Sequence, residues 1–173
     1  MARMVGRSEM TGPMETLMRL LAPSIAMAAA LTLSACGKSG GSAPGPAAPP
    51  DARTQAILDT LPPAYRHADL DNGEAKFAQC KACHTVVQSG PNMVGPDLWG
   101  VFGRKAGTVP GFSYSSGVKG LGFAWDADKI DHWIANPRAM VPDTHMTFLG
   151  FDNAKDRIDV VAYLKVASST PGQ

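Results

Sequence analysis

The segment Cys80-Lys81-Ala82-Cys83-His84 restricts the fold of this chain more than any other part of it. The Cys-x-x-Cys-His spacing places two thiols close together and an imidazole directly after them. This pattern is typical of covalent haem attachment, in which both cysteines form thioethers with the haem vinyl groups and the histidine binds iron. The motif therefore predicts one haem c linked to Cys80 and Cys83, with His84 as an iron ligand.

Two other interpretations use the same three residues, namely a dithiol redox pair and a zinc site. A thioredoxin-like pair is expected near a strand-helix-strand pattern, which we do not find in this sequence. A structural zinc ion usually takes four protein ligands, and the motif offers three. Both alternatives are therefore weaker than haem attachment.

The N-terminal part of the chain has the pattern of an export signal. Residues 20–33 form an apolar run preceded by three arginines, and the run is shorter than the about 20 residues that a membrane-crossing helix needs. Leu33-Ser34-Ala35-Cys36 follows and resembles the lipobox of bacterial lipoproteins. This resemblance implies a signal peptide over residues 1–35, lipidation of Cys36, and a lipid-anchored protein on the periplasmic side of the cell membrane.

Two alternatives for the leader remain open. An ordinary cleaved signal followed by an incidental Cys36 would give a soluble periplasmic protein. A leader that is not cleaved would act as a signal anchor instead. The lipid anchor is the favoured interpretation because it also accounts for the odd number of cysteines, which is three.

The composition divides the rest of the chain into a tether and a domain. Residues 36–68 begin with a stretch of Gly, Ser, Ala and Pro that is typical of a flexible linker. The later part of this segment carries Ile57, Leu58, Leu61 and Tyr65, which predict a short helix or strap ending at Pro62-Pro63. Residues 69–173 form the predicted haem domain.

Periodicity and caps predict three main helices in this domain. The first begins near Asp71-Asn72 and runs into the Cys80 turn, and the second follows an Asp126 N-cap. The third follows Asp152-Asn153. The long loops between the first two helices would be unusual without a cofactor at the centre, so we expect a buried haem to supply the missing core.

A second axial ligand is required for a haem that only carries electrons. The segment Pro142-Asp143-Thr144-His145-Met146 supplies a methionine in a loop that begins with proline. Met146 is therefore the candidate for the second iron ligand, although methionine is more often a packing residue.

The order of several blocks resembles class I cytochrome c of the mitochondrial and alphaproteobacterial kind, over Gly73 to Lys165. The matching blocks are Gly95-Pro96-Asp97-Leu98, Gly100-Val101-Phe102-Gly103-Arg104-Lys105-Ala106-Gly107, Pro110-Gly111-Phe112-Ser113-Tyr114, Trp125, Asn136-Pro137 and Ala162-Tyr163-Leu164-Lys165. The interval from His84 to Met146 also agrees with the family. The resemblance implies an all-α class I cytochrome c fold with three main helices and long loops around one covalent haem.

The resemblance also implies roles for further residues. The Pro96 carbonyl would accept a hydrogen bond from His84, and Thr144 would support the methionine loop. Three residues would hold the haem propionates through hydrogen bonds, namely Arg104, Tyr114 and Trp125. Two positions depart from the family pattern, because Trp133 replaces a usual tyrosine and Val118 replaces a common asparagine.

These features predict an electron-transfer protein and not an enzyme. The resemblance implies a monomeric one-electron carrier between a quinol:cytochrome c oxidoreductase and a terminal oxidase. A haem peroxidase-like enzyme or a haem sensor is the alternative, and it would require Met146 to leave iron. Removal of residues 1–35 leaves 13 basic and 13 acidic residues, a balance that argues against nucleic acid as a partner.

Overall fold

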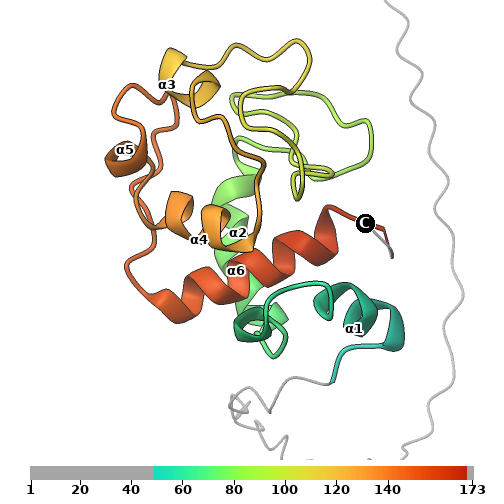
Figure 1. The fold of residues 1–173 in the computed structure, drawn as a ribbon. Coiled ribbons are helices and arrows are strands. Elements are labelled where there is room, and N and C mark those ends of the chain that lie inside the picture. Colours follow the sequence, from blue (N-terminus) through green and yellow to red (C-terminus); the bar gives the residue numbers. More distant parts are fainter. Residues whose placement is uncertain (1–48, 171–173) are drawn as a thin grey trace, which may run out of the picture. The chain divides into compact units, whose positions relative to one another are not determined.

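The computed structural model describes residues 49–170, and all regular structure in this range is helical (Figure 1). The elements are α1 (Ala52–Leu58), the 3₁₀ helix η1 (Pro63–Tyr65), α2 (Leu70–Lys81), α3 (Ser116–Lys119), α4 (Ala127–Ala135), α5 (Pro137–Met140) and α6 (Ala154–Ala167). Within residues 49–170 the extended backbone forms only an isolated bridge between Lys105 and Ala124. The predicted all-α class is confirmed.

The leader and residues 36–48 of the predicted tether lie outside the described residues. This holds for the predicted signal peptide over residues 1–35 and for Cys36. Among the helices in residues 49–170, none has the length and apolar character that a membrane span requires.

The three predicted main helices correspond to α2, α4 and α6. The Asp126 carboxylate caps α4 by accepting a hydrogen bond from the backbone N–H of Lys129 at 2.8 Å. Asn153 caps α6 in the same way through Lys155, also at 2.8 Å. α2 begins earlier than predicted, because the Asp69 carboxylate accepts from the N–H of Asn72 at 3.0 Å and caps the helix.

α6 is the helix with the most packing partners among the described elements. α2 has the most extensive contact with it, and α4, α1 and η1 also pack on it (Figure 1). The buried Asp159 carboxylate fixes the start of α2 against α6, accepting from the Asp69 N–H at 2.9 Å and the Asn72 amide at 2.7 Å. Lys155 Nζ pairs with the same carboxylate at 2.6 Å, so this buried charge is compensated.

The sequence predicted a short helix or strap in the segment that precedes residues 69–173, and the structure forms α1 and η1 there. Three side chains of this segment are at most 5% exposed and belong to the main hydrophobic core, namely Leu58 of α1, Leu61 of the connection and Tyr65 of η1. Tyr65 Oη also donates a hydrogen bond to Asp128 of α4 at 3.0 Å. We call residues 51–66 the strap, because this segment packs on α6 and is bonded to α4.

Candidate functional site

The Cys-x-x-Cys-His motif lies in the turn that ends α2. The backbone N–H groups of Cys83 and His84 both donate to the carbonyl of Cys80, at 3.0 and 2.9 Å. This turn brings the two thiols and the imidazole to one end of α2, where all three side chains line the same cavity. Sequence and structure therefore agree on the placement of the motif.

The properties of the thiols do not favour a redox pair. Neither cysteine forms a disulfide, and burial raises the pKa of the Cys80 thiol to about 11. Reactive dithiols have lowered pKa values, because the thiolate is the attacking species. Among residues 49–170 there is no group of three or more His, Cys, Asp or Glu side chains arranged to hold a metal ion.

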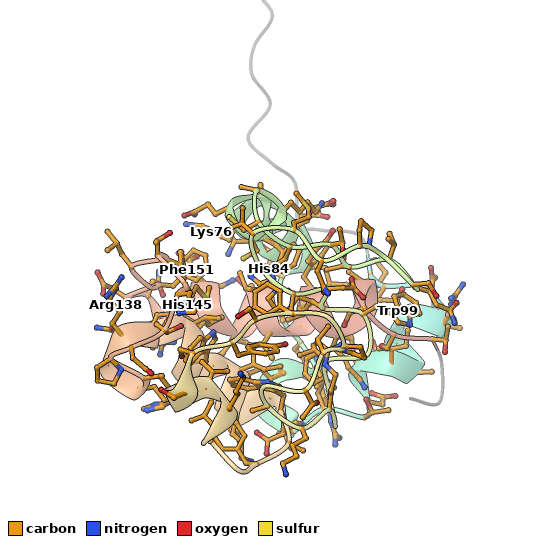
Figure 2. The ribbon with its side chains drawn as sticks, turned by 90° about the horizontal axis from the view of Figure 1, so that it is seen from above. Lys76, His84, Trp99, Arg138, His145 and Phe151 are labelled. Atoms are coloured by element: carbon orange, nitrogen blue, oxygen red, sulfur yellow. The ribbon has the colours of Figure 1, made fainter. Side chains whose placement is uncertain are left out.

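The cavity has a volume of about 340 Å³ and is enclosed by helices and by the long loops. Figure 2 shows His84 in the middle of the described structure, with Arg138 and Trp99 towards opposite ends. Apolar side chains from α2, α4, α6 and the connecting loops form much of the wall, namely Phe77, Val94, Leu98, Val101, Phe112, Val118, Ile130, Ile134, Val160 and Leu164. The cavity thus combines a largely apolar wall with a small number of ligand-type side chains.

Two contacts fix the orientation of the His84 ring. Its Nδ1 lies 2.7 Å from the carbonyl oxygen of Pro96, so Nδ1 carries the proton and Nε2 is left as the ligand atom. Burial lowers the pKa of His84, although the hydrogen bond to Pro96 opposes this effect. The predicted contact with Pro96 is therefore present, and the imidazole is neutral at neutral pH, as iron ligation requires.

Gly95 leaves room for this ring. A Cβ atom at position 95 would lie 2.3 Å from Cε1 of His84, much closer than carbon atoms approach each other. We expect Gly95→Ala to displace the imidazole and to weaken iron binding, with a haem spectrum that shifts towards high spin. The measurement is the optical spectrum of the holoprotein. Gly120→Ala is the control, because its Cβ would meet nothing closer than 3.3 Å, and an unchanged Gly95→Ala spectrum would contradict the expectation.

The loop that carries Met146 borders the cavity on another side. We call residues 142–150 the methionine loop. Met146 and Thr144 both line the cavity, and the Met146 N–H donates to Thr144 Oγ1 at 3.2 Å. Phe148 also lines it and packs against Phe151 with a centroid distance of 4.9 Å. The structure thus brings the methionine predicted from sequence to the same cavity as His84.

The three residues predicted to hold propionates also line this cavity. Arg104 donates to the carbonyls of Trp99 and Asp97, at 2.9 and 2.8 Å, which fixes the guanidinium and uses two of its five N–H groups. Burial raises the pKa of Tyr114, so its hydroxyl stays a hydrogen-bond donor. Trp125 packs edge-on against Trp133, which occupies the cavity wall as well.

Sequence reasoning missed several residues of the site. Ser115 and Val94 line the cavity although no motif marks them. Val118, noted only as a departure from the family pattern, is 7% exposed and also lines the cavity. Ile130, Ile134 and Leu164 of α4 and α6 also line the cavity, and the apolar periodicity of these helices is the signal that could have assigned them to it.

These observations define the class of protein. A helical fold encloses an apolar cavity in which a Cys-x-x-Cys-His turn faces a methionine loop, and this donor set fits a single covalently attached haem. The glycine at position 95 supports the fit, because it opens the space that the histidine ring occupies.

Comparison with known proteins identifies the family. No protein-family model matches the chain. Cytochrome c2 of Rhodomicrobium vannielii is 46% identical over 101 residues, 58% of this chain and 81% of that protein. A cytochrome c homologue of Bradyrhizobium diazoefficiens is 38% identical over 136 residues, covering 78% of this chain and 68% of that protein. Cytochrome c of Gibberella zeae is 43% identical over 98 residues, 56% of this chain and 92% of that protein. The chain belongs to the class I cytochrome c family.

Family membership establishes the general activity. The protein is a monohaem electron carrier and not an enzyme, and its cofactor is haem c. Cys80 and Cys83 occupy the attachment motif of that cofactor.

Proposed function

We propose that this protein carries single electrons from a quinol:cytochrome c oxidoreductase to a terminal oxidase, with His84 and Met146 as the axial iron ligands. The observation that supports this most strongly is the convergence of the two cysteines, His84 and Met146 on one cavity from separate parts of the chain. Haem c, when bound, supplies reversible one-electron exchange between ferric and ferrous iron.

The side chains around the cavity have distinct tasks in this proposal. His84 presents Nε2 to iron while Pro96 holds its other nitrogen. Met146 would hold the iron through its neutral thioether, a ligand that favours the ferrous state and leaves less room for other ligands. The apolar walls exclude water and so disfavour the more highly charged ferric state.

Arg104, Tyr114 and Trp125 are proposed to hold the propionates. A buried carboxylate needs hydrogen bonds to offset its loss of hydration. Arg104 retains N–H groups beyond the two that donate to backbone carbonyls, and the Tyr114 hydroxyl and Trp125 indole offer two further donors on the cavity wall. Thr144 is proposed to support Met146 through its hydrogen bond.

The proposed partners are membrane respiratory complexes, approached through a surface of low net charge. Residues 69–173 contain ten basic and eleven acidic residues, and the exposed side chains of Val94 and Leu149 are apolar. Long-range electrostatic steering should therefore be weak. We expect turnover with a partner oxidase to change little between low and moderate salt concentration, and a steep fall would contradict this part of the proposal.

We further propose a lipid anchor at Cys36, on the periplasmic side of the cell membrane, joined by residues 36–68 to the haem domain over residues 69–173. The lipobox-like sequence before Cys36 supports it. Such an anchor would raise the effective concentration of the carrier near membrane complexes. Mass spectrometry of the membrane fraction tests this, since the mature N-terminus should be a lipidated cysteine; an unmodified N-terminus at another residue would refute the anchor.

The decisive test of the ligand assignment is the optical spectrum of the holoprotein in both oxidation states. Sharp low-spin bands in the reduced protein, with the weak near-infrared band of methionine sulfur bound to ferric iron in the oxidised protein, support His84 and Met146 together. A high-spin haem that binds added ligands at once would refute Met146 as a ligand.

A further inference from the structure

The methionine loop makes a side-chain contact with a segment distant in sequence. The contact comes from Asp143, three residues before Met146. Its carboxylate accepts hydrogen bonds from Ser116 Oγ at 2.9 Å, from the N–H of Gly117 at 3.0 Å and from Ser115 Oγ at 3.3 Å. We call this set of hydrogen bonds the Asp143–α3 contact.

This contact is the polar connection of the methionine loop to the rest of the fold. The other hydrogen bonds made by residues 142–150 in the described structure are local, such as Met146 N–H to Thr144 and Thr144 N–H to Val141. Within residues 49–170, all hydrogen bonds from this loop to a segment distant in sequence come from Asp143. Removing the carboxylate would therefore leave the loop held by packing, by its own turns and by the hydrogen bond at its end, in which the Phe151 N–H donates to the Ile134 carbonyl at 2.9 Å.

The segment on the other side of the contact is also part of the cavity wall. Ser115 is 7% exposed, lines the cavity and caps α3 through the N–H of Val118. Val118 lines the cavity as well. The Asp143–α3 contact thus joins two walls of one cavity, the wall that carries Met146 and the wall formed by the start of α3.

At Gly117 the two walls lie so close together that a methyl side chain on this residue would not fit. A Cβ atom on Gly117 would lie 2.1 Å from Oδ1 of Asp143 and 2.5 Å from Cγ1 of Val141. Val141 is buried and comes directly before the methionine loop. A glycine at position 117 is therefore required for the carboxylate to reach α3.

We propose that Asp143 is a positioning residue that holds the methionine loop against α3 and thereby keeps the Met146 thioether in the cavity. This inference rests on the proposed role of Met146 as an iron ligand. Hydrogen bonds from Gly117 and Ser116 lower the pKa of Asp143, so the group is an ionised acceptor at neutral pH. Its effect is on how readily the sulfur leaves iron, because Asp143 itself is exposed and touches no reacting atom in the described structure.

The test measures how fast imidazole binds to the ferric holoprotein, since imidazole enters only after Met146 has left. Asp143→Asn keeps the shape of the side chain and removes the charge. We expect imidazole binding to become about three- to tenfold faster, a modest effect because the contact is exposed to solvent. Asp152→Asn is the matched control, since this exposed aspartate lies outside the methionine loop, and it should keep the wild-type rate.

A second pair of variants tests the same contact from α3. Gly117→Ala should displace the Asp143 carboxylate without changing its charge and should speed imidazole binding in the same way. Gly120→Ala, in the same helix region but with its nearest neighbour at 3.3 Å, should keep the wild-type rate. Wild-type rates in both Asp143→Asn and Gly117→Ala would overturn the proposal.

The outcomes separate this inference from the proposed function. If the wild-type protein lacks the sulfur band, Met146 is not the ligand and both proposals fail. If the band is present and the two contact variants exchange ligands at the wild-type rate, only the role of Asp143 fails. General destabilisation is tested with Leu58→Ala in the strap, because an equal acceleration by that remote change would also overturn a specific role for Asp143.

Discussion

Replacing Met146 with alanine is expected to abolish the sulfur-to-iron band of the oxidised protein and to lower its midpoint potential. The thioether lines the cavity, and an alanine side chain is too short to replace it. Loss of a neutral sulfur ligand removes a group that favours ferrous iron, so the potential should fall within the roughly 0.8 V range that axial ligands span. The measurements are the near-infrared spectrum and a potentiometric titration.

The matched control for this change is Met93→Ala. Met93 is 47% exposed and does not line the cavity, so its replacement should preserve both the band and the potential. A band that persists in Met146→Ala would show that another residue binds iron. The covalent linkage should survive in both variants, because it depends on Cys80 and Cys83 rather than on the axial methionine.

The main helices were predictable because their signals are local. Asp126 and Asn153 cap the helices that follow them, and a cap is recognised from a few neighbouring residues. The start of α2 was misplaced by two residues because the sequence offers acidic residues at 69 and 71, and only the fold shows that Asp69 is the cap. Helix type and order were therefore predictable from the sequence, whereas this boundary was not.

The residues of the site also fall into two groups: those that could be recognised in the sequence, and those that only the fold brings together. The Cys80 to His84 motif is contiguous, so its chemistry is visible in the sequence. Met146 was chosen from its loop that begins with proline, and its interval from His84 agrees with the family pattern. The Asp143–α3 contact joins the methionine loop to the start of α3, about 27 residues away in sequence, and no period or motif marks it. Contacts of this kind depend on how loops meet around the cofactor, and a sequence pattern does not specify that.

The strap shows how composition alone can conceal packing. Pro62-Pro63 and the adjacent linker placed this segment with the flexible tether, although its apolar residues had suggested a short helix. In the structure Pro63 begins η1, and its missing N–H has no cost there because the first N–H groups of a helix have no partner within the helix. The chain then turns so that Tyr65 reaches Asp128. The burial of Tyr65 and its hydrogen bond to Asp128 raise the pKa of Tyr65, so the phenol remains a donor to α4 at all ordinary pH values.

Leu58→Ala is expected to lower the free energy of unfolding of the holoprotein by about 2–5 kcal/mol, the usual cost of a cavity left by a buried leucine. Leu58 is 1% exposed and belongs to the core shared with α6, yet it does not line the haem cavity. The measurement is urea denaturation followed by circular dichroism, with the sulfur band recorded before denaturant is added. That band should be unchanged, because the substitution affects the strap and not the ligands.

Leu149→Ala provides the matched control, since Leu149 is 87% exposed and the same truncation there removes little packing. Its cost should stay within about 0.5 kcal/mol, as for most surface substitutions. If Leu58→Ala costs no more than Leu149→Ala, the strap is not bound to α6 in solution. If instead the large difference is observed, the strap belongs to the folded domain and is bound to α6 in solution.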